Sequence, residues 1–274
     1  MKAFYSDHFV LPLPEGHRFP MAKYKMLRDS VEGLPNLELV EAPCATDSEL
    51  LLAHDPSYIQ EVLHGTLSEA QQKEIGFPWS PKMVERSRRS AGATIAACKA
   101  ALEEGISANL AGGTHHAYRN KGSGFCVFND AAIAARVLLK DARAKAGGIS
   151  KIGILDLDVH QGDGTAAILQ HDSAVITVSV HGEKNYPFAK EVSDLDIALA
   201  DGSTDSVYMQ ALKQALIYLS EQKIDFLIYL AGADPYYEDR LGRLQISQEG
   251  MALRDYKVLE FASTQGIAMA LAMA

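Results

Sequence analysis

The stretch IGILDLDVHQGDG, residues 152–164, decides the fold class. Its first half is apolar at consecutive positions, which is typical of a strand buried on both faces in a parallel sheet. Ionisable residues then follow at every second position, Asp156, Asp158 and His160, and alternation along a strand would place them on one face. Because α/β proteins bind ligands at the carboxyl ends of parallel strands, this spacing predicts a site there.

Two carboxylates and an imidazole that are buried together favour a bound cation. Burying charged groups is costly unless an opposite charge compensates them, and Asp oxygen with His nitrogen suits Zn²⁺, Fe²⁺ or Mn²⁺. Cys44, Cys98 and Cys126 lie far apart and odd in number, so we expect free thiols rather than a thiolate site or disulfides. From this segment alone, a strand end capped by Asp-Gly turn chemistry is the structural alternative.

The rest of the chain alternates between apolar strands and amphipathic helices. Further buried strands are expected at residues 174–180 and 226–230, and the last segment, 266–274, is also expected to be a strand. Four helices are expected: one from Ser80-Pro81 to Gly105, one after Asp130 that stops at Gly147-Gly148, one over residues 205–222, and one after Ser247. The pattern predicts a single α/β domain with a parallel sheet.

Composition excludes several classes of protein. The 274 residues are 47% hydrophobic and 22% charged, as in a soluble globular protein. The longest apolar runs, residues 226–233 and 267–274, are far shorter than the roughly 20 residues that span a bilayer, and no secretory signal is evident, so we expect a cytoplasmic protein. A net charge of −9 argues against nucleic acid as a partner and favours cationic small molecules.

Two more polar clusters follow apolar or glycine-rich segments. His115 and His116 lie within GGTHHA, residues 112–117, and taken alone this pair is as easily explained by ordinary polar histidines as by a site. A carboxylate hydrogen-bonded to one imidazole nitrogen would set the tautomer for proton transfer, and Asp156 and Asp163 are candidates for that carboxylate. Asp234 follows the strand at 226–230 and would supply a third metal ligand, with an acidic Asp-Pro turn as the alternative.

Four motifs occur in a specific order: HHA at 115–117, GFCxxND at 124–130, DxDxHxGDG at 156–164 and GADP at 232–235. This combination resembles the histone deacetylase superfamily, and the short chain looks like bacterial members similar to the class IV deacetylases. GHRFP at 16–20 and HDPSYI at 54–59 extend the resemblance over nearly the whole chain. The resemblance implies one three-layer α/β/α domain of the arginase/deacetylase fold with a central eight-stranded parallel sheet.

The resemblance also implies roles for the polar residues. Asp158, His160 and Asp234 would bind Zn²⁺ or Fe²⁺ and leave a position open for water. His116, paired with Asp163, would be the general base and then the general acid. His115, paired with Asp156, would be its electrostatic partner.

The same resemblance implies a substrate channel and a second cation site. Phe125 would form one wall of a narrow channel for an acyl-lysine, and Tyr186 or Phe188 the opposing wall. A K⁺ site would use Asp156, Asp158, Ser179 and the backbone oxygens of His160 and Val180.

The expected function is therefore a zinc-dependent amidohydrolase that removes an acyl group from lysine or a polyamine. Family members carry a tyrosine after the last strand whose hydroxyl donates to the developing oxyanion, whereas this sequence stops at Ala274. We therefore expect the native chain to be longer. Tyr118, Tyr236 and Tyr237 are interpreted as packing or rim residues. The alternatives are a catalytically silent protein that binds acylated ligands, and an arginase-like ureohydrolase, whose two-metal ligand pattern the His115-His116 pair does not match.

Overall fold

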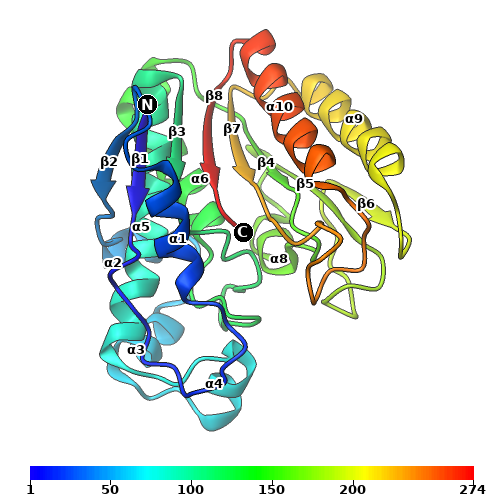
Figure 1. The fold of residues 1–274 in the computed structure, drawn as a ribbon. Helices are drawn as coiled ribbons and strands as arrows, with labels where there is room; N and C mark the ends of the chain where they lie inside the picture. Colours follow the sequence, from blue (N-terminus) through cyan, green and yellow to red (C-terminus); the bar gives the residue numbers. More distant parts are fainter.

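A single eight-stranded sheet runs through the chain, and all of its strand pairs are parallel (Figure 1). The computed structural model describes residues 1–274 except for the side chain of Arg143. The strand order is β2-β1-β3-β8-β7-β4-β5-β6, which confirms the predicted eight-stranded parallel sheet. The strands are β1 (Lys2–Tyr5), β2 (Glu38–Glu41), β3 (Ile106–Asn109), β4 (Ile152–Asp156), β5 (Val175–Gly182), β6 (Leu195–Leu199), β7 (Phe226–Leu230) and β8 (Ala268–Ala272).

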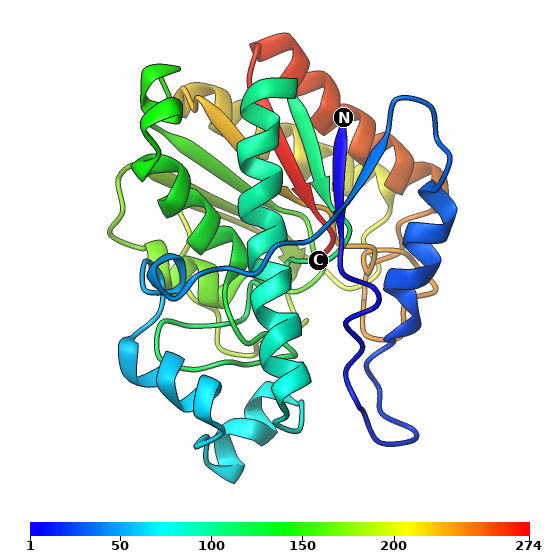
Figure 2. The same cartoon turned by 90° about the vertical axis from the view of Figure 1, so that its left-hand side faces the viewer.

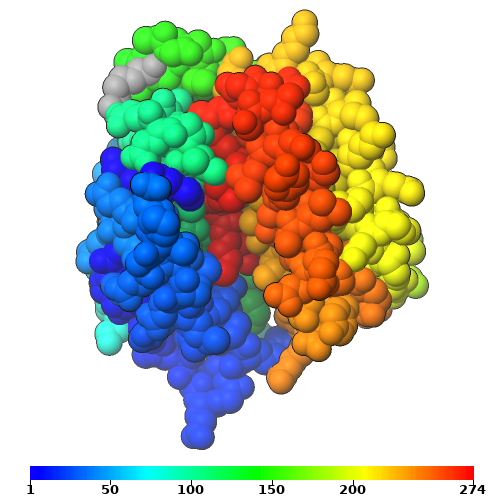
Figure 3. Space-filling model, turned by 45° about the horizontal axis from the view of Figure 1, so that its top comes forward, coloured from blue at the N-terminus to red at the C-terminus, as the bar shows by residue number. Residues whose placement is uncertain are grey.

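Helices cover both faces of the sheet and complete the three layers (Figure 2). Helices α5 and α6 pack together on one face, whereas α9 and α10 lie side by side on the other and form much of one surface of the molecule (Figure 3). The helices are α1 (Ala22–Val31), α2 (Asp47–Leu50), α3 (Pro56–His64), α4 (Glu69–Ile75), α5 (Pro81–Glu104), α6 (Asp130–Lys140), α7 (Ala142–Ala146), α8 (Asp163–Leu169), α9 (Asp205–Gln222) and α10 (Gln248–Gln265).

The central strands are buried on both faces, as their sequences predict. In β4, Ile152 and Ile154 belong to the core beneath α5 and α6, whereas Leu155 belongs to the core beneath α9 and α10. Successive side chains of a strand point to opposite faces, so a strand covered on both sides must be apolar at every position. The two cores pack on opposite faces of these strands, and the polar clusters lie at the strand ends.

One predicted helix is interrupted. The helix expected between Asp130 and Gly147 ends at Lys140, and α7 follows as a separate piece. Asp141 is extended (ψ 129°) and its carboxylate accepts the backbone N–H of Ala144, so it ends the first helix and caps the second. The strand predicted at the end of the chain is confirmed, as are the helices predicted from Ser80-Pro81 to Gly105, over residues 205–222 and after Ser247.

Cys44, Cys98 and Cys126 are free thiols, as expected. Among the helices that the structure describes, none combines the length and the apolar character needed to cross a membrane.

Candidate active site

Two adjacent strand ends bring the predicted metal ligands together. Asp156 ends β4 and lies opposite Leu230, which ends β7. The prediction that Asp158 and His160 lie on the strand face is wrong, because β4 stops at Asp156 and both residues occupy the following loop. Side chains shape that loop instead: Asp156 accepts the N–H of Asp158 at 3.1 Å, and Asp158 accepts the N–H of His160 at 2.7 Å.

The side chains of Asp158, His160 and Asp234 form a compact cluster. The Nδ1 of His160 lies 2.9 Å from Oδ1 of Asp158 and 3.0 Å from Oδ2 of Asp234, and one ligand atom from each residue lies within 4.8 Å of the others. Burial opposes a charge on His160, yet hydrogen bonds to both carboxylates raise its pKa to about 10. The cluster therefore demands a positive charge at its centre, and its oxygen and nitrogen donors fit Zn²⁺ or Fe²⁺.

Each histidine of the pair in the 112–117 loop donates to its own carboxylate. Nδ1 of His115 donates to Asp156 at 2.7 Å, and Nδ1 of His116 donates to Asp163 at 2.6 Å. This fixes the tautomer of His116 and leaves the lone pair of its Nε2 free to accept a proton. The His116 ring lies 5.9 Å from the His160 ring, beside the metal-ligand cluster.

Burial and neighbouring charges separate the proton affinities of the two histidines. Burial, together with the charge of His115, lowers the pKa of His116 to about 4. For His115 burial also favours the neutral ring, but the charges of Asp156 and Asp158 outweigh it and raise the pKa to about 9. His116 is therefore the neutral member of the pair near pH 7 and His115 the charged one.

A buried network holds the loop that carries both histidines. Asp130 accepts the N–H of Thr114 at 2.8 Å, and the side-chain amide of Asn129 donates to the carbonyls of His115 at 3.3 Å and Ala117 at 3.1 Å. From the sequence, Asn129 was noted only as part of the GFCxxND motif, and Asp130 also as the residue after which a helix was expected. Their position at the start of α6, where side chains cap the first turn, was the available signal for such a role.

His54 is hydrogen-bonded to this network through Asn129. It is fully buried, and its Nε2 accepts the backbone N–H of Asn129 at 2.9 Å, so the neutral ring carries its proton on Nδ1. Burial is the chief cause that lowers the pKa of His54 from 6.5 to about 4. Between these two pH values the unfolded chain binds a proton that the folded chain does not, so the free energy of unfolding falls as the pH falls from 6.5 to 4.

We expect His54→Gln to flatten this pH dependence. Glutamine keeps an acceptor for the N–H of Asn129 but does not titrate. Between pH 7 and pH 4 the free energy of unfolding should therefore fall by about 3 kcal/mol less in the variant than in the parent. Urea unfolding of the metal-free protein at a series of pH values measures this. His171→Gln, at an exposed histidine, is the control and should follow the parent. Parallel curves for the parent and His54→Gln would contradict the prediction.

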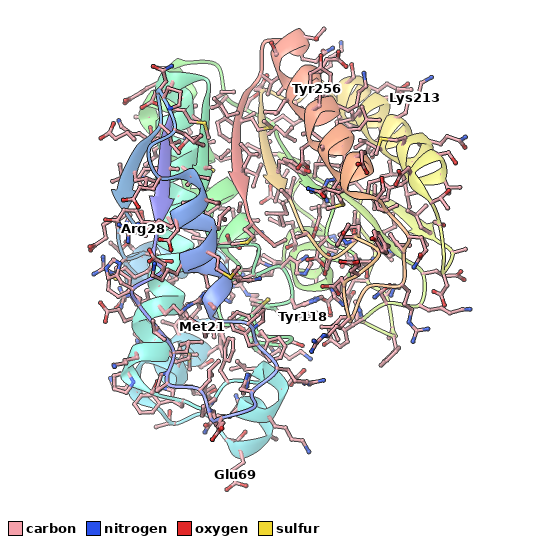
Figure 4. All side chains as sticks on the ribbon, in the orientation of Figure 1. Met21, Arg28, Glu69, Tyr118, Lys213 and Tyr256 are labelled. Atoms are coloured by element: carbon pink, nitrogen blue, oxygen red, sulfur yellow. The ribbon has the colours of Figure 1, made fainter. Side chains whose placement is uncertain are left out.

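Tyr118 was expected to be a packing or rim residue, and its hydroxyl bonds a carboxylate of the site. Its hydroxyl lies 3.0 Å from Oδ2 of Asp163 and 3.3 Å from the carboxylate of Glu191, beyond the carboxyl ends of the strands (Figure 4). Asp163 thus accepts a hydrogen bond from His116 on Oδ1 and one from Tyr118 on Oδ2. Nothing in the spacing between Tyr118 and the motifs indicated this contact.

The structure places the three predicted channel residues differently. The Tyr186 ring stands at 87° to the His116 ring with 4.9 Å between centroids, and its hydroxyl bonds Ser123 Oγ at 2.6 Å. Phe125 packs beside Phe77, with 5.3 Å between ring centroids. Phe188 is 88% exposed, so Tyr186 and not Phe188 lies against the catalytic candidates.

Gly124, next to Phe125, permits this arrangement. A Cβ at Gly124 would lie 2.6 Å from Cδ2 of His116, and its φ of 53° is one that other residues rarely adopt. The chain segment that carries Phe125 can therefore approach His116 only because a glycine lies between them.

A small cavity of about 10 Å³ lies beside the end of β4 and is bordered by Asp156 and Ser179, two of the predicted K⁺ ligands. This volume is enough for one water-sized particle. Ser179 Oγ also bonds Nδ1 of His181 at 2.9 Å.

Comparisons with known proteins agree with this architecture. A model of the histone deacetylase domain matches residues 17–273. An uncharacterized protein of Picosynechococcus sp. is 42% identical over 97% of this chain and 88% of its own length. The histone deacetylase-like amidohydrolase of Pseudomonas aeruginosa is 30% identical over 83% of this chain, which spans 62% of that protein. The structure of a histone deacetylase homologue from Aquifex aeolicus superposes with a TM-score of 0.83 at 23% identity, over 99% of this chain and 78% of that one.

Proposed function

Because the chain belongs to the histone deacetylase family, we propose that it is a metal-dependent deacylase acting on an acyl-lysine or an acylated polyamine. The products would be a free amine and a carboxylate. The observation that carries the proposal is the convergence of Asp158, His160 and Asp234 beside His116, whose Nδ1 is held by Asp163.

Asp158, His160 and Asp234 would hold the catalytic metal, Zn²⁺ or Fe²⁺. When bound, the ion would supply Lewis-acid polarisation of the amide carbonyl and of the attacking water. The two carboxylates and one imidazole are three ligands, which is the number that catalytic zinc sites use when a position is kept open.

The proton transfers would be carried out by His116. Its Nε2 would accept the proton of the water whose oxygen forms the new bond to the carbonyl carbon. The same nitrogen would then return the proton to the amide nitrogen as the carbon–nitrogen bond breaks. Asp163 holds the ring in the tautomer this requires, and His115 would add positive charge next to the reacting groups.

The acyl-lysine or polyamine chain would pass between aromatic rings. Tyr186 packs against His116, and Phe125 lies next to Gly124, which contacts the same imidazole. Two such rings suit a linear aliphatic chain, and the net charge of −9 favours cationic amine substrates.

We further propose that a K⁺ ion binds next to the catalytic metal site. Its ligands would be Asp156, Asp158, Ser179 and the backbone oxygens of His160 and Val180. Two of these ligands, Asp156 and Ser179, border the small cavity beside the end of β4. Such an ion would offset the negative charge of Asp156 beneath His115.

An activity panel tests the proposal. The metal-loaded protein is given an acetyl-lysine peptide, a longer acyl-lysine peptide, an acetylated polyamine and arginine, and release of carboxylate, free amine or urea is measured. Amine and carboxylate in equal amounts from one of the first three support a deacylase. Binding of the acylated compounds without turnover would favour a silent acyl-binding protein, and urea release would favour an arginase-like enzyme.

A further inference from the structure

We propose that Arg254 is a positioning residue that fixes the spacing of the two loops carrying the metal ligands. The proposal rests on the metal site proposed above but not on the choice of substrate. Arg254 lies in α10 and is only 2% exposed. It touches neither the ligand side chains nor the catalytic histidines by any hydrogen bond described for it.

One guanidinium nitrogen reaches both loops. Nη1 of Arg254 donates to the carbonyl of Gly232 at 2.6 Å and lies 3.4 Å from the carbonyl of Leu157. Leu157 is the residue between Asp156 and Asp158, and Gly232 comes two residues before Asp234. A single side chain thus joins the backbone on which two of the three ligands are mounted.

The two loops also touch each other directly. The N–H of Val159 donates to Oδ1 of Asp234 at 2.8 Å, and a Cβ on Gly232 would lie 2.6 Å from Cα of Asp158. Metal affinity depends on three ligand atoms keeping a fixed separation, and here they come from two segments far apart in sequence. Contact brings the loops together, and the bonds to Arg254 set how they lie relative to each other.

Burying the guanidinium of Arg254 costs free energy, which argues that its bonds to the two loops have a functional role. A buried arginine is stabilised only when its donors are satisfied, and apolar replacements of buried ion pairs are often equally stable. Asp255, whose side chain is 44% exposed, accepts from Nε of Arg254 at 2.8 Å and balances the charge. Nη1 is directed at two backbone carbonyls just beyond the strand ends, those of Leu157 and Gly232, and these groups lie next to the metal ligands in sequence.

Measuring metal affinity distinguishes a positioning role of Arg254 from a general contribution to stability. We compare Arg254→Lys, which keeps the charge but replaces the fork by one ammonium, with Arg136→Lys as a matched control. Arg136 makes the same kinds of bond elsewhere, to the carbonyls of Leu52 and Ile168 and to Asp172. Zinc affinity is measured by competition with a chelating dye, and the free energy of unfolding of each metal-free variant is measured by urea titration.

We expect Arg254→Lys to weaken zinc binding by about 10- to 100-fold, the range seen when a group that supports metal ligands is lost. Arg136→Lys should leave zinc affinity unchanged, even if it lowers the free energy of unfolding as much as Arg254→Lys does. If Arg254→Lys is poorly folded, Arg254→Gln and titration in the stabilising osmolyte TMAO provide the same comparison. Equal zinc affinity in the parent and in folded Arg254 variants would overturn the inference alone. A parent protein that binds neither Zn²⁺ nor Fe²⁺ would overturn both the inference and the proposed function.

Discussion

Asp158→Ala should abolish stoichiometric metal binding and, with it, deacylation. The substitution removes one of three ligands from a site whose other members, His160 and Asp234, come from two separate loops. Loss of a direct ligand should weaken binding by more than the roughly 100-fold that an outer hydrogen bond can cost. Elemental analysis after dialysis measures the metal content, and circular dichroism reports whether the variant is folded.

Asp163→Asn is the matched control for this experiment. Asp163 is also a buried carboxylate in the same site, but it bonds His116 and Tyr118 and does not belong to the ligand cluster. The control should keep its metal, while its turnover falls. A folded Asp158→Ala protein that retains full metal content would remove Asp158 from the ligand set, whatever its activity.

Local patterns sufficed to predict the fold class. Continuous apolar runs such as 226–230 and the long amphipathic helix over residues 205–222 each carry their signal within a single segment. The four-residue strands β1, β2 and β3 were not predicted. So short a segment has little pattern of its own, and its strand character comes from pairing, as where Ala3 lies between Leu39 and Ala108.

The structure brings the predicted metal ligands close together, but the geometry by which it does so was predicted only in part. Ligands at strand ends converge because neighbouring parallel strands end at one edge, and that expectation holds for Asp158 and Asp234. The alternation argument failed because turns built by side chains, not a continuing strand, orient Asp158 and His160. Arg254 gave no signal, since a single arginine in a helix looks solvent-exposed until the packing of α10 buries it.

His116→Ala should lower turnover by about 10²- to 10⁴-fold, the usual contribution of a general acid–base group. Metal content and substrate binding should persist, because His116 is not in the ligand cluster and its bond is to Asp163. Turnover is measured at saturating acyl-lysine peptide on metal-loaded protein. A fall in metal content equal to the fall in activity would show that His116 supports the metal site instead.

Tyr118→Phe shows how much of this effect depends on the orientation of the His116 ring. The variant removes the hydroxyl from Oδ2 of Asp163 but leaves the 2.6 Å bond between Oδ1 and His116. Turnover should therefore fall by much less than in His116→Ala, with metal content unchanged. Asp163→Asn should lie between the two, because an amide accepts the Nδ1 proton less strongly than a carboxylate does. If His116→Ala and the parent turn over equally while both bind substrate, a different group moves the proton. The bonds of Asp163 would then serve only to hold the loop.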